Sequence, residues 1–319
     1  MTTIAPPPGS SVSVVVPVYN AERSLEELVA RLEPVLAATF ERFELILVND
    51  GSADASWTVV TDLSRRSPWV TGIDLMRNYG QHNALLCGIE QATGELVVTM
   101  DDDLQHRPED IPVLVAALDD QTDVVYGTPR EEQHGLLRDF ASRSTKLALK
   151  STMGVRAASL VSPFRLFRTR VREAFAGCHH PWVTVDVLLS WGTSRFKGVA
   201  VPHEERRHGR SNYDLRRLVR HAANMITGYS TLPLRLASLA AFVFMLFGFG
   251  VLAFVLLRAL LFGRQVPGFA MLASLITILS GVQLFSLGIL GEYVARMHVR
   301  MLESPPFVVR TRTGGRGPA

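Results

Sequence analysis

Two long stretches without a charged side chain lie in the second half of the chain, at residues 236–257 and 269–290. Each is long enough for a membrane-spanning helix, which needs about 20 residues. The short link between them contains glycine and proline, which favour a turn. The sequence therefore predicts a tight helical hairpin with both ends on one side of a bilayer. The alternative is a buried hairpin in the core of a soluble domain.

The distribution of arginines predicts the orientation of this hairpin. Only Arg264 lies in the link, whereas arginines are frequent before and after the two stretches. The positive-inside rule then places both flanks in the cytoplasm. The formal net charge of the whole chain is only +3, which gives no reason to expect a nucleic-acid partner. The two cysteines have no metal-type spacing, and we expect free thiols: Cys87 and Cys178.

The first half of the chain alternates short apolar runs with segments of helical periodicity. The runs that predict strands are 12–18, 43–48, 70–75, 96–100 and 124–127. Helices are predicted over 22–38, 55–64, 83–91 and 108–118. This alternation is typical of a doubly wound parallel sheet with helices on both faces. Residues 1–10 are rich in proline, have no apolar core, and are interpreted as a flexible tail and not a signal peptide.

Polar clusters follow three of the predicted strands, where ligands bind in such sheets. The most acidic is Asp101-Asp102-Asp103. Adjacent carboxylates repel one another, and a divalent cation such as Mg²⁺ or Mn²⁺ relieves that cost. Asp101 and Asp103 form the natural metal-binding pair, with the amide oxygen of Gln105 as a third ligand. The alternative is an acidic turn that caps the following helix. Asp50, followed by Gly-Ser, is either a turn residue or an acceptor for a nucleobase N–H.

Taken together, these motifs resemble the family 2 glycosyltransferases with the GT-A fold. The matching segments are VVPVYN at 15–20, VNDGS at 48–52 and the D-x-D-type DDDLQ at 101–105. Further matches resemble the polyprenyl-phosphate glycosyltransferases in particular, which include dolichyl-phosphate mannose synthases, bactoprenol glucosyltransferases and the aminoarabinose transferases of undecaprenyl phosphate. These matches lie at 77–82, 127–130, 164–167, 206–213 and 290–293.

The resemblance implies an α/β GT-A catalytic domain, with a Rossmann-like doubly wound sheet, followed by a two-helix transmembrane hairpin. The implied domains are 11–231, then the hairpin at 232–295 and a cytoplasmic tail at 296–319. Leucines and basic residues at helical spacing predict helices near 136–153 and 213–231, which are either interfacial helices or ordinary surface helices. The resemblance implies inverting transfer of a sugar from a UDP- or GDP-sugar to undecaprenyl or decaprenyl phosphate. The enzyme would be metal-dependent and multi-pass in the bacterial inner membrane, with its catalytic domain on the cytoplasmic side.

The resemblance also implies roles for individual residues. Catalysis is assigned to Asp101, Asp103 and Arg165, and the metal to Asp101, Asp103 and Gln105. The nucleotide-sugar is assigned to Pro17, Tyr19, Glu22, Asp50, Asn78, Asp102 and Arg206. The acceptor phosphate is assigned to Arg130, Arg138 and Ser211. A guanidinium group can donate to two phosphate oxygens at once. Each of these arginines is also interpretable as a solvated surface charge.

Three departures from the family pattern bear on function. Ala21 stands where relatives often carry Glu, so Glu22 is expected to take that contact, or the contact is lost. Asn212 replaces a common lysine. Residues 158–162 contain no carboxylate to serve as a base, which favours an anionic phosphate acceptor over a hydroxyl. The alternatives are a hydroxyl-directed glycosyltransferase and a non-catalytic nucleotide-sugar-binding membrane protein.

Other features leave more than one interpretation open. His82 is interpreted either as a phosphate donor or proton carrier, or as a structural residue. Asp50 is compatible with uracil and with guanine, and the resemblance to the bactoprenol enzymes favours UDP. Helical hairpins in a bilayer often pack against copies of themselves, so a homo-oligomer is compatible with the sequence.

Overall fold

The computed structural model describes residues 10–129, 155–177, 184–202, 204, 232–262, 268–301 and 305–314. The chain divides into two compact units. The first comprises residues 1–214 together with residues 303–319, and the second comprises residues 215–302. The second unit is therefore inserted into the sequence of the first.

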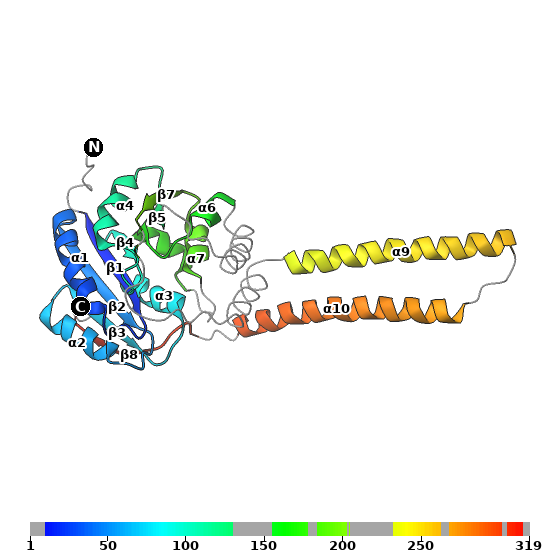
Figure 1. The fold of residues 1–319 in the computed structure, drawn as a ribbon, viewed down its shortest axis with the longest axis horizontal. Coiled ribbons are helices and arrows are strands. Elements are labelled where there is room, and N and C mark those ends of the chain that lie inside the picture. The colour runs from blue at the N-terminus through cyan, green and yellow to red at the C-terminus, as the bar shows by residue number, and fades with distance from the viewer. Residues whose placement is uncertain are drawn as a thin grey trace. The chain divides into compact units, whose positions relative to one another are not determined.

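The first unit is built on an eight-stranded sheet in the order β7-β5-β6-β4-β1-β2-β3-β8 (Figure 1). Strands β1 to β5 and β7 all run in the same direction, whereas β6 and β8 are antiparallel to their neighbours. The predicted doubly wound α/β sheet is confirmed, with these two reversed strands added. The strands are β1 (Ser11–Val18), β2 (Arg42–Asn49), β3 (Val70–Leu75), β4 (Leu96–Thr99), β5 (Val124–Pro129), β6 (Arg165–Arg168), β7 (Phe196–Val201) and β8 (Val309–Thr313).

Helices cover both faces of the sheet, which explains why the central strands are almost continuously apolar. Every residue of β1 is buried, and its side chains alternate between the two faces. Val14 and Val16 pack toward α1 (Leu25–Thr39), α2 (Ser56–Arg66) and α4 (Ile111–Ala117). Val15 packs toward α3 (Gln81–Gln91) and α7 (Val185–Gly192). Shorter helical segments are η1 (Pro108–Asp110), α6 (Val155–Leu160) and η2 (Thr169–Phe175).

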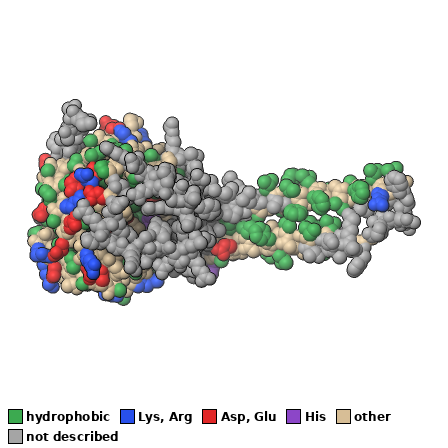
Figure 2. Space-filling view, viewed as in Figure 1, with side chains coloured by type: hydrophobic (Ala, Val, Ile, Leu, Met, Phe, Trp, Pro, Cys, Tyr) green, Lys and Arg blue, Asp and Glu red, His purple; other side chains and the backbone are tan. Residues whose placement is uncertain are grey.

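The described residues of the second unit form two long helices, α9 (Leu232–Phe262) and α10 (Phe269–Met301), which lie side by side in opposite directions. The predicted apolar stretches fall inside them. Within α10, the 18 residues Ile278–Ala295 are long and apolar enough to cross a membrane, and none of that window is buried. In α9 the stretch Ala237–Val251 is also apolar, but it is shorter than the 18 residues of that window. Figure 2 shows apolar side chains exposed along this unit.

The C-terminal segment differs from the tail expected at residues 296–319. Helix α10 continues through Met301, and residues 309–313 form β8 beside β3. The sequence of β8, Val-Arg-Thr-Arg-Thr, is short, and two of its five residues are charged. It adds to the edge of a sheet that is already formed, where charged residues are common. Such a strand carries too little apolar periodicity to be predicted from the sequence.

Candidate functional site

The loops that follow β1, β2, β3 and β4 are joined to one another by hydrogen bonds at the carboxyl ends of these parallel strands. The backbone N–H of Tyr19 donates to Asp102 over 3.1 Å. The backbone N–H of Asn20 donates to the hydroxyl of Ser52 over 3.0 Å. The sequence correctly predicted that polar clusters would gather at this edge, and the contacts make the four loops one connected structure.

Asp50 fastens the loop after β2 to the loop after β3. One carboxylate oxygen accepts the backbone N–H of Tyr79 over 2.7 Å, and the other accepts that of Gly80 over 2.9 Å. Asp50 is only 3% exposed. Burial raises the pKa of its carboxyl group, and the two N–H bonds counter part of that rise. Asp50 thus has a structural role beside the nucleobase contact that the sequence predicts.

Gly51 is required where these two loops meet. Its φ of +66° lies in the left-handed region, and a Cβ there would lie 2.5 Å from the backbone nitrogen of Asn78. Asn78 itself is exposed on the loop, as a nucleotide-binding residue would need to be. The guanidinium of Arg77 lies 4.5 Å from the centre of the Tyr79 ring, in cation–π geometry.

The loop after β1 is held mainly by the start of α2. Glu22 accepts the backbone N–H of Ala55 over 3.1 Å, while its own N–H donates to Asp54 over 3.2 Å. Glu22 therefore stabilises the helix start, a role different from the predicted nucleotide contact. Tyr19 is 53% exposed at the end of β1, whereas Pro17 is buried within that strand. Of the two, Tyr19 is the one accessible to a ligand.

Each carboxylate of the acidic loop makes a separate contact. Asp101 accepts the side-chain amide of Gln81 over 2.6 Å, and Asp102 accepts the N–H of Tyr19. Asp103 accepts the backbone N–H of Gln105 over 3.1 Å, which closes a local turn. All three are partly exposed. Leu104, at φ +60° and 1% exposed, anchors the turn in the core in a conformation that is unusual for a branched residue.

No group of three or more His, Cys, Asp or Glu side chains in the described ranges is arranged to hold a metal ion. The chemistry of the loop still suits a hard cation, because Asp101, Asp103 and Gln105 offer only oxygen ligands. Mg²⁺ usually takes one or two protein carboxylates and completes its shell with water and substrate phosphates. A partly exposed pair of carboxylates fits that mode better than a closed protein cage.

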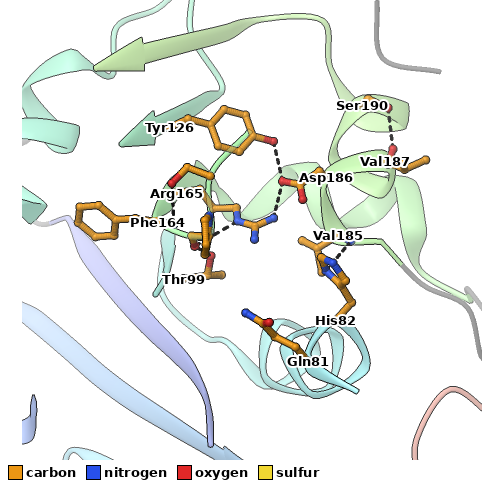
Figure 3. Close-up of polar contacts among 12 residues, drawn as sticks. Gln81, His82, Thr99, Tyr126, Phe164, Arg165, Val185, Asp186, Val187 and Ser190 are labelled. Atoms are coloured by element: carbon orange, nitrogen blue, oxygen red, sulfur yellow. Dashed lines mark hydrogen bonds and ion pairs between the residues drawn. The ribbon is translucent and has the colours of Figure 1, made fainter. Parts of the chain in front are cut away.

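Arg165 lies inside the domain, paired with a carboxylate (Figure 3). Its guanidinium donates to Asp186 over 2.5 Å, and the hydroxyl of Tyr126 donates to the same oxygen over 2.9 Å. Arg165 is 2% exposed. Burial, next to the charge of Asp186, raises the pKa of Tyr126 well above its usual value. Arg165 here neutralises a buried carboxylate, which differs from the phosphate contact expected from the sequence.

The first turn of α3 connects the acidic loop to α7. Gln81 reaches Asp101, and the Nδ1 atom of His82 accepts the backbone N–H of Val185 over 3.4 Å. Val185 is the first residue of α7 and precedes Asp186. Figure 3 shows the side chains of Gln81 and His82 emerging from adjacent positions of α3. The contact of His82 is of the structural kind.

Sequence reasoning missed the residues whose importance depends on partners distant along the chain. Asp186 and Tyr126 carry no motif of their own, and only the fold brings them to Arg165. Gln81 lies in the segment 77–82 that the resemblance quoted, and that segment was the available signal. The remaining predicted residues lie outside the described part of the chain: Arg130, Arg138, Arg206 and Ser211.

Comparisons with known proteins agree with this architecture. Residues 13–176 match the family described as Glycosyl transferase family 2. The chain is 37% identical over 307 residues to an undecaprenyl-phosphate 4-deoxy-4-formamido-L-arabinose transferase of Pseudomonas aeruginosa, covering 95% of this chain and 91% of the relative. It is 33% identical over 307 residues to the protein of the same name from Klebsiella pneumoniae, covering 95% and 94%.

A solved structure also shares the fold. Glucosyl-3-phosphoglycerate synthase from Mycobacterium tuberculosis, in complex with Mn²⁺, UDP-glucose and phosphoglyceric acid, gives a TM-score of 0.52 at 20% identity. The match covers 69% of this chain and 78% of that chain. At this level of identity the similarity supports the GT-A-type fold alone.

Proposed function

The chain belongs to glycosyl transferase family 2, and we propose that it transfers a sugar from a nucleotide-sugar to a polyprenyl phosphate. The observation that carries this proposal is similarity along almost the whole length of undecaprenyl-phosphate transferases, which includes the membrane unit as well as the catalytic domain. A family 2 domain that uses a soluble acceptor would not need two long helices with exposed apolar side chains.

The donor would bind at the carboxyl ends of β1 to β4. The exposed ring of Tyr19 and the loop that Asp50 holds are placed for the nucleoside, and UDP is the favoured nucleotide over GDP. Asp101 and Asp103, with Gln105, would hold a Mg²⁺ or Mn²⁺ ion. The ion would neutralise charge on the donor diphosphate as it leaves. The residues of the chain orient the diphosphate, because the four loops are fixed to one another.

In the proposed reaction, an oxygen of the lipid phosphate attacks the anomeric carbon of the sugar. The bond from that carbon to the nucleoside diphosphate breaks on the opposite side, so the configuration inverts. A phosphate monoester is already anionic at neutral pH, since its second pKa is about 6, and no side chain has to take a proton from it. Asp186 is unsuited to be a base, because it is buried and already accepts two hydrogen bonds.

The membrane unit would hold the enzyme at the surface where the lipid phosphate lies. The residues on either side of the second unit, 1–214 and 303–319, both belong to the first unit. Both ends of the helix pair would then lie on the same side of a bilayer, as a two-helix hairpin requires. The arginines that flank the hairpin favour the cytoplasmic side. The proposed location is the bacterial inner membrane, with a multi-pass anchor and the catalytic domain in the cytoplasm.

Sugar transfer by the full-length protein in detergent tests the proposal. The assay supplies undecaprenyl phosphate, Mg²⁺ or Mn²⁺ and a panel of UDP- and GDP-sugars, and detects the lipid product by mass. We expect a product with one sugar that disappears on chelation. Asp103→Ala should lose that activity. Asp120→Ala should retain it, because this exposed carboxylate precedes β5 and so lies toward the amino-terminal ends of the parallel strands, away from the site.

Two other results would redirect the assignment. Transfer only to a sugar or glycolipid hydroxyl would replace the phosphate acceptor. Metal-dependent nucleotide binding without transfer from any donor would indicate a non-catalytic binding protein.

A further inference from the structure

The last strand of the sheet contacts the loop that follows β3. The backbone N–H of Met76 donates to the carbonyl of Val308 over 2.9 Å. The guanidinium of Arg310, in β8, donates to the carbonyl of Met76 over 2.7 Å. These bonds hold the first residue after β3 from two directions. The same loop continues to Tyr79 and Gly80, which Asp50 holds at its far end.

Arg310 also neutralises a carboxylate inside the domain. Its second guanidinium nitrogen lies 3.2 Å from one oxygen of Asp74, which is 3% exposed. The other oxygen of Asp74 accepts the side-chain amide of Asn49 over 2.7 Å. Asn49 directly precedes Asp50 in the sequence. A continuous set of contacts therefore leads from Arg310 through Asp74 and Asn49 to the residue that fastens the two loops.

We propose that Arg310 is a positioning residue for the donor nucleotide, acting through Asp74 and the loop at residues 76–80. This inference deepens the proposed function and rests on it for the identity of the ligand. Arg310 lies in the short segment that follows the membrane unit, about 230 residues beyond the loop it supports. Its side chain is half exposed, so its charge costs little to keep solvated, while it relieves the full burial of Asp74.

Loss of Arg310 has a defined physical consequence. Asp74 would remain buried with one amide partner, and an uncompensated buried charge is strongly unfavourable. The carbonyl of Met76 would lose its side-chain donor. The loop at 76–80 would then keep its hydrogen bonds to Asp50 and the backbone bond to Val308, and it would sample more positions. A donor that needs this loop in one position binds more weakly, because part of its binding energy goes to ordering the loop.

Arg312 offers a matched control. It lies two residues further along β8, opposite Ile73, and is also exposed. Its side chain makes no hydrogen bond or ion pair with any described residue. Arg312→Met therefore removes the same charge from the same strand without touching Asp74 or Met76.

The experiment compares Arg310→Met, Arg310→Lys and Arg312→Met in the full-length protein. Titration calorimetry with UDP or GDP and Mn²⁺ gives the Kd and, through the stoichiometry, the folded fraction. We expect Arg310→Met to raise the Kd and the donor KM about tenfold, with the KM for undecaprenyl phosphate unchanged. Arg310→Lys should recover part of the affinity, because an ammonium restores the charge and cannot hold both acceptors as a guanidinium does. Arg312→Met should match the wild type.

The outcomes separate positioning from simple stability. A Kd for Arg310→Met within twofold of that for Arg312→Met overturns the inference. A lower binding stoichiometry with an unchanged Kd also overturns it, since that result describes fewer folded molecules. If the wild-type protein transfers no sugar, the proposed function is contradicted. A tenfold higher Kd of Arg310→Met would in that case still uphold the role of Arg310.

Discussion

The guanidinium of Arg165 and the carboxylate of Asp186 form an ion pair 2.5 Å long in the interior of the catalytic domain. Breaking one side of such a pair leaves a buried charge without compensation, which costs about 3–5 kcal/mol. We predict that Arg165→Met lowers the thermal midpoint strongly, while the folded fraction keeps its affinity for the donor. Thermal unfolding in detergent and nucleotide titration measure the two effects.

Arg170→Met is the control for this prediction. Arg170 pairs with Asp123 over 2.9 Å, but its side chain is 66% exposed. An exposed pair contributes about 1 kcal/mol or less. Equal stability of the two variants, combined with a selective loss of phosphate affinity in Arg165→Met, would instead support a direct phosphate contact for Arg165.

Gly51 and Gly80 test the packing of the two loops. Both have positive φ, but only at Gly51 would a Cβ meet backbone atoms, whereas nothing lies within 4 Å at Gly80. We predict that Gly51→Ala costs at least about 2 kcal/mol of stability, from strain and displacement of the loop. Gly80→Ala should cost only the strain of its backbone conformation. Similar midpoints for the two variants in a thermal-shift measurement would contradict the tight approach at Gly51.

The carboxyl group of Asp50 predicts a pH dependence. Because burial raises its pKa in the folded protein, Asp50 contributes most to stability when it is protonated, below the usual value of 3.8, and that contribution is lost as the pH rises through the raised pKa. Asn at this position does not titrate, and its NH₂ group would face one of the two loop N–H donors. The midpoint of the wild type minus that of Asp50→Asn should therefore become smaller from pH 4 to pH 7. A difference that grows over this range would contradict the raised pKa.

Cys87 should be unreactive in the folded protein. It is buried in α3, and burial raises the pKa of its thiol to about 12, so almost no thiolate exists at pH 8. We expect maleimide to label Cys87 in the Cys178→Ser variant only after denaturation. Stoichiometric labelling of the native protein at pH 8 would show that α3 opens readily from the sheet.

The sequence was sufficient to predict the central strands and the edge where the site forms. The apolar run of β1 and the polar residues after β2, β3 and β4 define both features locally, within a few residues. The acidic loop and its oxygen ligands also follow from the local sequence, and the family resemblance added roles for individual residues. The comparisons confirm the family, and the roles of individual residues stay predictions.

What the sequence could not predict depends on contacts between distant segments. For Glu22 the sequence left open a nucleotide contact or the loss of that contact, and it did not predict the hydrogen bond that holds the start of α2. Arg165 was expected at a phosphate, but Asp186 takes it into the core. Neither partner can be inferred from sequence spacing, because the order of the strands in the sheet, and not helix or strand periodicity, brings the two residues together.

The interrupted first unit also has a consequence for how the protein is made. Chains fold from the N-terminus as they leave the ribosome. Strand β8 and Arg310 are encoded after both apolar helices, so the ribosome synthesises the whole second unit before the sheet receives its last strand. The contact between Arg310 and Met76 is therefore among the last to form, and a nascent chain that stalls within the second unit carries a catalytic domain with an open edge at β3.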